Sequence, residues 1–216
     1  MLKKRTQEEL IMDEKTKEAL KAMYDMADNA ENCISSLQTA LIYNSSKPLK
    51  DCETTVKDIK KTEAVITKKI AELAKDNPDL KQYVSVPAHL LRIGENIEKL
   101  SELMDKKIKD DILFSDKAVT EITFLLQRIV DVMRPTSDII LAKNTILGRY
   151  VQESEEGIVK RATEYATLHE ERLIEGLCLP VASSIFINML DSIKNIAWHA
   201  KEITSKLVGW MLPKAQ

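Results

Sequence analysis

Apolar residues recur three or four positions apart along most of the chain, which is the spacing of one face of an α-helix. The first such stripe covers residues 20–41, and the turn-forming segment 44–48 (NSSKP) ends it. The second stripe covers residues 52–73 and stops before the sequence DNP at 76–78. The two stripes predict two long amphipathic helices joined by a short turn.

A third stripe returns later in the chain with the same spacing. Its positions in the first half are Tyr83, Val86, Leu90, Ile93, Ile97, Leu100 and Met104. In the second half the corresponding positions are Phe186, Met189, Ile193, Ile196, Ala200, Ile203 and Leu207. This recurrence is an internal repeat, and it indicates that one helical unit occurs twice.

Two further stripes lie between the copies, and each predicts a helix. Ser115 is a candidate N-cap of the fourth helix, because a serine hydroxyl accepts a hydrogen bond from the first turn. Pro135 should kink this helix, since proline lacks a backbone donor. We expect a break near residues 147–148 before the fifth helix, whose stripe covers residues 151–165.

The pattern predicts an all-α protein built from two tandem, antiparallel three-helix bundles, residues 1–110 and 111–216. The chain has only 5 glycines and 6 prolines, and 31% of its residues are charged, which favours helices with a narrow apolar seam over a sheet. One helix cannot bury its stripe alone, so antiparallel neighbours should pack at small crossing angles. The two bundles should lie end to end or side by side.

Composition excludes several classes of function. The formal net charge is −2 with both signs interspersed, so we expect no nucleic-acid partner. Cys33, Cys52 and Cys178 form no CxxC pair and are odd in number, which favours a reducing, cytoplasmic location. The longest uncharged run, residues 176–190, is too short for a membrane span, so we expect the protein to meet a membrane only through a partner.

No spacing in the sequence points to catalysis. None of the three histidines follows a glutamate by three positions, as the ligands of a di-iron bundle do. The chain also lacks HExxH, a phosphate-binding glycine loop and GxSxG, so we expect no enzyme activity. Glu63 and Glu155 occupy seam positions, where a carboxylate either binds a cation or pairs with a neighbouring Lys or Arg.

The histidines and tryptophans have simpler interpretations. His169 lies on a seam and should be a hydrogen-bonded core residue, whereas His89 and His199 fall beside the stripes and should lie at helix edges. Trp198 and Trp210 lie near the end of the chain. We expect the two indoles to pack between the bundles, the alternative being an exposed docking surface.

Two segments of the repeated stripe carry a recognisable motif. Residues 90–97 read LLRIGENI and residues 193–200 read IKNIAWHA. Both resemble the third-helix signature of PhoU-like proteins, regulators of phosphate uptake, which reads Leu-Glu-Arg-Ile-Gly/Ala-Asp-His-Ala. Residues 169–176, followed by Cys178-Leu-Pro, also look like the turn into the last helix of those proteins and of the PhoU-like tails on sodium/phosphate cotransporters. The residues singled out at positions of this motif are Arg92, Gly94, Glu95, Asn195 and His199.

The departures from the motif bear on metal binding. The resemblance implies a six-helix fold, and some family members hold metal clusters through acidic residues four positions apart. Here those positions are Leu91 and Glu95 in the first repeat, and Lys194 and Trp198 in the second. Because a lysine and an indole cannot hold a hard cation, we expect no stoichiometric cofactor. At most, a loosely bound divalent cation should lie near Glu63 and Glu95.

The resemblance implies a non-catalytic cytoplasmic regulator or adaptor of phosphate transport or phosphate signalling that binds a phosphate transporter or sensor protein. The alternative is a metal-binding helical bundle that uses the first-repeat carboxylates for sensing or storage. A third reading is a structural module that only oligomerises. The sequence leaves open whether the chain is a monomer or a homodimer.

Overall fold

The computed structural model describes residues 7–209, and the side chains of residues 13–209. The described residues form six long helices and contain no β-strand, which confirms the all-α prediction. The helices are α1 (Gln7–Tyr43), α2 (Leu49–Asp76), α3 (Val86–Lys109), α4 (Asp116–Ala142), α5 (Thr145–Ile174) and α6 (Pro180–Val208), with a short 3₁₀-helix, η1 (Pro78–Tyr83), before α3.

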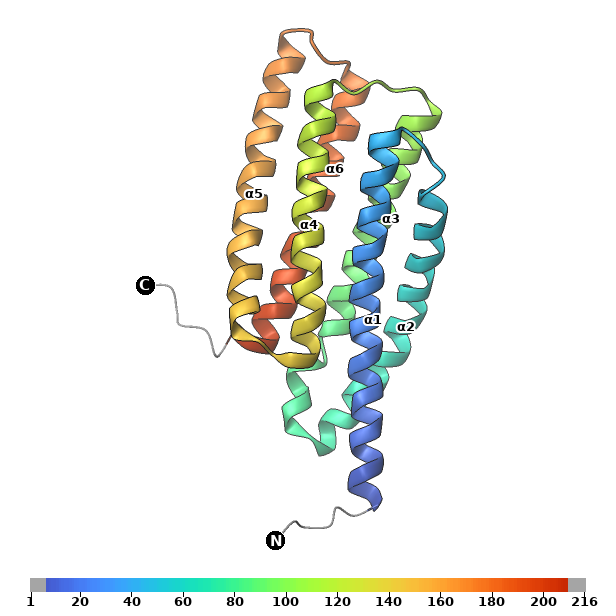
Figure 1. Ribbon diagram of the computed structural model, residues 1–216, viewed down its shortest axis with the longest axis vertical. Coiled ribbons are helices and arrows are strands. Elements are labelled where there is room, and N and C mark those ends of the chain that lie inside the picture. Colours follow the sequence, from blue (N-terminus) through green and yellow to red (C-terminus); the bar gives the residue numbers. More distant parts are fainter. Residues whose placement is uncertain (1–6, 210–216) are drawn as a thin grey trace, which may run out of the picture.

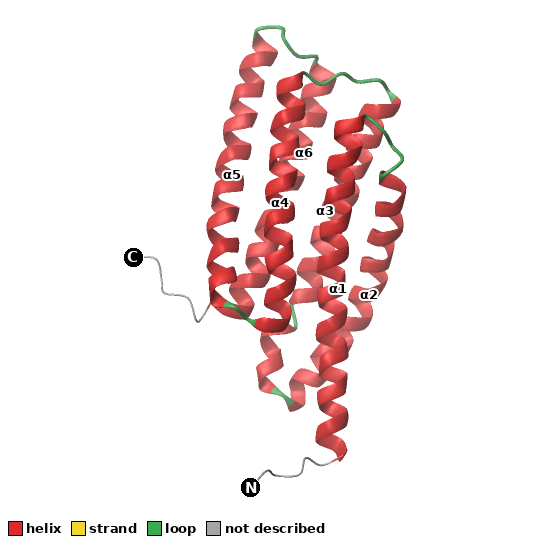
Figure 2. Cartoon of the chain, viewed as in Figure 1, coloured by secondary structure: helices red, strands yellow, loops and turns green. Residues whose placement is uncertain are grey.

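The six helices form two antiparallel three-helix bundles that lie side by side (Figure 1). Helices α1–α3 make one bundle and α4–α6 the other, and the bundles meet where α1 packs on α4 and α3 packs on α6. Their apolar faces join in one continuous cluster of buried side chains. Figure 2 shows the loops collected at the two ends of the molecule, with those after α1, α3 and α5 at the same end.

Local chemistry sets where several helices begin and end. Helix α1 stops at Tyr43 because Asn44 takes a left-handed conformation, φ 46°, which asparagine tolerates better than most residues. Helix α4 begins after Ser115, whose hydroxyl accepts a hydrogen bond from the Ala118 backbone N–H at 3.2 Å. This N-cap confirms the role predicted for Ser115.

The break expected near residues 147–148 is wrong. Helix α4 ends at Ala142 and α5 begins at Thr145, after Asn144, whose side chain caps the new helix. Gly148 lies inside α5, and a Cβ built there would come within 2.4 Å of Val208 Cγ2 in α6. The glycine therefore permits a close approach of two helices and does not interrupt one.

Two other positions add detail to the sequence pattern. Tyr83, the first member of the third stripe, lies in η1, and its hydroxyl donates to the Ile140 carbonyl of α4 at 3.0 Å. Pro135, where we predicted a kink, lies within α4, which continues to Ala142.

In the part of the chain that the structure describes, no helix has both the length and the hydropathy needed to cross a bilayer.

Candidate functional site

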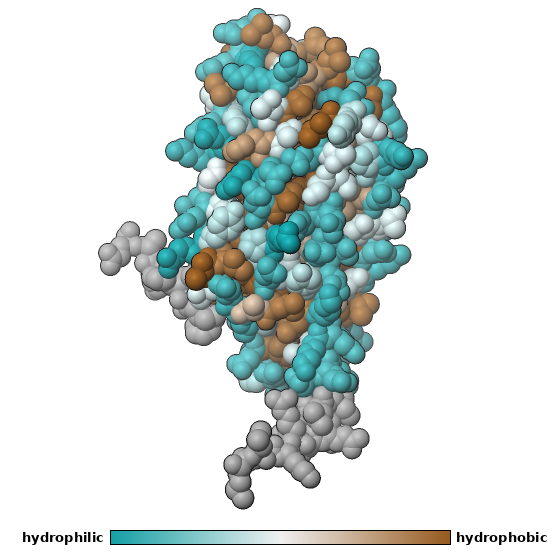
Figure 3. Space-filling model, in the orientation of Figure 1, coloured by the Kyte–Doolittle hydropathy of each residue, from teal (hydrophilic) through white to brown (hydrophobic). Residues whose placement is uncertain are grey.

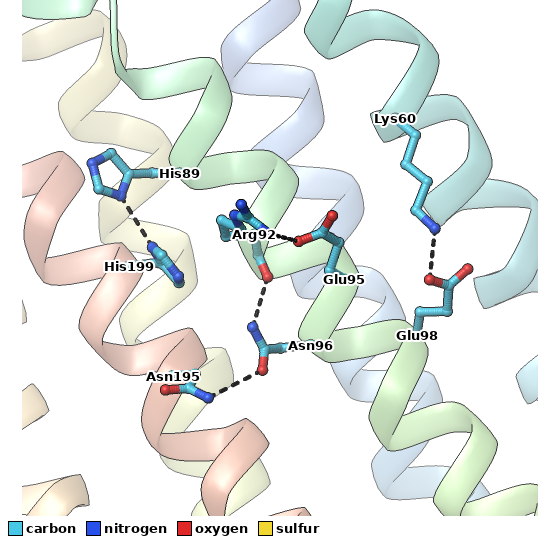
Figure 4. A network of polar contacts seen from close by, with 8 residues as sticks. All are labelled: Lys60, His89, Arg92, Glu95, Asn96, Glu98, Asn195 and His199. Carbon is cyan, nitrogen blue, oxygen red and sulfur yellow. Dashed lines mark hydrogen bonds and ion pairs between the residues drawn. The ribbon is translucent and has the colours of Figure 1, made fainter.

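The two motif segments lie against each other, because they occupy the faces along which α3 and α6 meet (Figure 4). His89 of α3 and His199 of α6 point toward one another, with their Nδ1 atoms 3.0 Å apart. Further along the same contact, Asn195 Nδ2 donates to Asn96 Oδ1 at 3.4 Å. The contact between the repeats therefore has a polar row along its partly exposed edge, beside the apolar core.

The paired imidazoles are held in their neutral form. Burial lowers the pKa of His199 to about 4, with further contributions from the neighbouring His89 and Arg92. Burial also lowers the pKa of His89, and the positive charge of Lys206 adds to the shift. At neutral pH one Nδ1 therefore carries a proton that it donates to the other Nδ1, which accepts it through a lone pair.

Trp198 lies at the edge of this histidine pair. Its indole packs edge-on against the His199 ring, with ring centroids 4.7 Å apart, and its centroid is 6.1 Å from that of His89. The indole remains 44% exposed, so it packs against the contact between the bundles and also faces solvent. Trp210, the other tryptophan considered above, lies outside the described residues.

The remaining motif positions of α3 have structural partners. Arg92 Nη1 and Glu95 Oε2 form an ion pair, 2.8 Å apart, on the surface of the helix. Gly94 faces α2, where an added Cβ would come within 3.3 Å of Ile59 Cγ2. The motif glycine therefore lets α2 and α3 pack closely.

The two seam glutamates also have partners within the chain. Glu63 accepts a hydrogen bond from the Thr67 hydroxyl at 2.8 Å. Glu155 is buried between α5 and α6 and pairs with Lys201, with Nζ and Oε2 3.0 Å apart. Across the described residues, no three His, Cys, Asp or Glu side chains form a group that could hold a metal ion. The expectation that these carboxylates hold no stoichiometric metal stays a prediction.

A carboxylate-lined groove between α2 and α3 was not anticipated from the motif. It encloses about 180 Å³, and the acidic residues that line it are Glu53, Glu98, Glu102 and Asp105. Lys60 pairs with Glu98 at 2.6 Å and Lys109 pairs with Asp105 at 2.6 Å. Two of the four negative charges are therefore already compensated.

The second bundle contains a buried polar cluster that sequence reasoning found only in part. Glu121 of α4 binds Arg172 of α5 through two parallel hydrogen bonds of 2.9 and 2.7 Å. His169 Nε2 lies 2.8 Å from the Ser183 hydroxyl, which confirms the hydrogen-bonded core histidine. Glu121 could have been noticed, because it lies three positions after Ala118 and four before Leu125 on the buried face of α4.

The protonation of this cluster argues against a serine nucleophile. Arg172 Nη2 lies 3.3 Å from His169 Nδ1, and a guanidinium can only donate, so Nδ1 must accept. The ring proton is then on Nε2, which donates to Ser183 Oγ. A general base would have to accept the serine proton at that same nitrogen, so His169 is in the wrong tautomer for that task.

One end of the molecule exposes a set of large apolar side chains, here called the apolar end. They come from the loops between α3 and α4 and between α5 and α6, and from the adjoining turns of α5 and α6. They are Leu113, Ile174, Leu177, Leu179 and Val181. Three of them, Leu113, Leu177 and Leu179, line a hollow of about 240 Å³. Apolar side chains gathered at that end are visible at the top of Figure 3.

The six-helix arrangement, with two side-by-side bundles and paired third helices, is the PhoU fold. A solved structure similar to this chain is that of PhoU from Pseudomonas aeruginosa, with a TM-score of 0.81 and 14% sequence identity, covering 90% of this chain and 96% of that one. No protein-family model and no curated protein matches the sequence. The likeness confirms the resemblance found in the motif segments at the level of the fold.

Proposed function

We propose that this protein is a non-catalytic, cytoplasmic regulator of phosphate transport or phosphate signalling, and that it acts by binding a phosphate transporter or sensor protein. The observation that carries the proposal is the match of nearly the whole chain to PhoU, 90% of it at a TM-score of 0.81. The motif segments within α3 and α6 support the same assignment.

The apolar end is the surface that we assign to partner binding. Ile174 is 86% exposed and Leu113 73%, although burying such side chains stabilises a protein by about 1.5–3 kcal/mol each. A contiguous exposed apolar patch is typical of a surface that binds another protein. Docking there would act on the partner by occlusion or by favouring one of its conformations.

A complementation experiment in the organism of origin tests the proposal. Cells that lack the protein should take up radiolabelled phosphate at an altered rate when phosphate is plentiful, and the wild-type gene should restore normal uptake. Leu177→Glu together with Leu179→Glu should fail to restore it, because two charges on the apolar end oppose burial against a partner.

Lys68→Glu is the matched control, since Lys68 is exposed on α2 and should complement as well as wild type. Affinity purification of the wild-type protein should recover a phosphate transporter or sensor, and the double variant should lose it. Uptake that is unaffected by loss of the gene would contradict the proposal.

A further inference from the structure

Two of the three cysteines meet where α1 packs on α2. Cys33 lies on α1 and Cys52 lies on α2, and both side chains are buried. The Cys52 thiol donates a hydrogen bond to the Cys33 backbone carbonyl, with Sγ and O 3.3 Å apart. The packing of the two helices therefore brings together two residues that are 19 positions apart in the chain.

The two thiols also act on each other directly. A hydrogen bond from Cys52 lowers the pKa of the Cys33 thiol, and this effect is larger than the opposing effect of burial. The same contact with Cys33, together with burial, raises the pKa of Cys52. Cys33 is therefore the thiol that ionises, and the thiolate is the reactive form of cysteine. Two sulfur atoms within hydrogen-bond reach on packed helices are placed to form a disulfide, whose S–S bond is about 2.05 Å long.

A small molecule can reach this cysteine pair from solvent. Cys52 lines the groove of about 180 Å³ between α2 and α3. At the other edge of the pair, Ser36 lies against Cys52 and Thr55 lies against Cys33, and both of these hydroxyl-bearing side chains are half-buried. Hydrogen peroxide is close to water in size and fits such a groove, whereas a disulfide-bonded peptide is far larger.

We propose that Cys33 and Cys52 are a modification site, at which hydrogen peroxide forms an intramolecular disulfide between α1 and α2. The site is separate from the histidine pair and from the apolar end, and it goes beyond the proposed regulatory function, on which it does not depend. Both thiols are free in the structure, as expected in a reducing compartment. Disulfides in such compartments are typically transient and respond to oxidants.

The reaction balances with peroxide as the only oxidant. The Cys33 thiolate attacks one peroxide oxygen, an S–O bond forms and the O–O bond breaks. The other oxygen leaves as hydroxide, which takes up the proton lost by Cys33 and becomes water. The Cys52 sulfur then attacks the sulfenic acid on Cys33, and its oxygen leaves with the Cys52 proton as a second water. Two thiols lose two electrons in total, and one peroxide is reduced to two waters.

Peptide mapping of the unsubstituted chain tests the proposal. The protein is reduced, freed of reductant, treated with one equivalent of hydrogen peroxide, alkylated and digested with trypsin. Trypsin separates the two cysteines into residues 22–50 and 51–57. These two peptides should be recovered joined by a disulfide, and the number of free thiols per chain should fall from three to one. Dithiothreitol should restore all three.

Single substitutions separate the roles of the two sulfur atoms. Cys52→Ser should stop the reaction at a sulfenic acid on Cys33, which dimedone traps, because no second thiol is present to displace the oxygen. Cys33→Ser should leave Cys52 reduced, since burial still raises the pKa of Cys52 when Cys33 is absent. Cys178→Ser is the matched control. Cys178 lies between α5 and α6, so this variant should form the disulfide as wild type does.

The disulfide should also raise the thermal stability of the protein. The oxidised wild-type chain should melt about 5–10 °C above the reduced chain, because a bridge between α1 and α2 restricts the unfolded state. Three free thiols remaining in the folded protein after peroxide treatment would overturn the proposal. So would a disulfide that involves Cys178 or a second chain.

Discussion

At the scale of single residues, glycines occupy two different kinds of position in the helices. Gly148 of α5 stands against Val208 of α6, and a Cβ there would lie 2.4 Å from Val208 Cγ2. Gly157 lies on the same helix with nothing within 4 Å of an added Cβ. Only the first glycine is required by packing.

We therefore expect Gly148→Ala and Gly157→Ala to have opposite effects on stability. The Gly148 substitution should cost about 1–3 kcal/mol, because the new methyl group overlaps Val208. The Gly157 substitution should stabilise the protein by about 0.5–1 kcal/mol, because alanine loses less backbone entropy in a helix. Urea denaturation of each variant measures both changes. Adding Val208→Ala to the Gly148→Ala protein should restore part of the lost stability. Equal free energies of unfolding for Gly148→Ala and Gly157→Ala would refute the close contact.

The buried His169 predicts a dependence of stability on pH. Burial and the Arg172 charge lower the pKa of His169 below the value of about 6.5 for an unfolded chain. As the pH falls below about 6.5 the unfolded state therefore binds more protons than the folded state. The stability that His169 contributes is present above that pH and is lost as the pH falls toward the folded-state pKa.

Comparison with His169→Gln tests this dependence. The variant keeps a side-chain donor near Ser183 and has no group that titrates in this range. Its free energy of unfolding should fall less than that of wild type between pH 7.5 and 5.5, since all other titrating groups are common to both proteins. Parallel losses of stability in the two proteins would show that His169 does not contribute.

At the scale of elements, α3 and α6 carry the repeated stripe, and both bury it fully. Ile93 and Ile196 are corresponding positions of the repeated stripe in the sequence, and neither side chain is exposed. Each helix packs within its own bundle and against the other, so its stripe is covered from several sides. The spacing in the sequence identified these residues, because a position repeated on one helical face is a core position.

Replacing either isoleucine with alanine should cost about 2–4 kcal/mol, because the removed methyl and methylene groups leave a cavity in a packed core. Lys68→Ala on the exposed side of α2 should change stability by less than about 0.5 kcal/mol. Chemical denaturation monitored by circular dichroism gives all three values. Comparable, mild effects at Ile93 and Lys68 would show that the stripe has been assigned to the wrong face.

At the scale of the whole molecule, the two repeats share one hydrophobic core. Helix α1 packs along α4 and α3 packs along α6, and the Tyr83 hydroxyl binds a backbone carbonyl of α4. The sequence predicts residues 1–110 and 111–216 as two repeats, whereas the structure shows that the apolar faces of α1–α3 and of α4–α6 partly cover each other. Unfolding one bundle would expose the facing side of its neighbour.

We therefore expect the two bundles to unfold together. In the Trp210→Phe protein, the fluorescence of Trp198 reports on the α3–α6 contact, while far-ultraviolet circular dichroism reports on all helices. The two urea transitions should coincide, as in a cooperative two-state process. Two separated transitions would show that the repeats are independent domains.

The sequence by itself determined the helices, their order and most of their ends. Periodicity located the seams, and local signals such as Ser115 and the NSSKP segment marked helix boundaries, because these features depend on neighbouring residues only. The local pattern predicts a break at Gly148, and this prediction is wrong. Only the position of Val208 on another helix reveals why a glycine is there.

Only the tertiary structure decided which polar groups meet. His89 and His199 are far apart in the chain, and both lie beside the stripes, so no local pattern pairs them. Glu155 likewise pairs with Lys201, and Glu121 pairs with Arg172. In both pairs the partner lies on another helix. Helix formation follows from the order of neighbouring residues, whereas a site between helices depends on how their faces are rotated and offset when they pack.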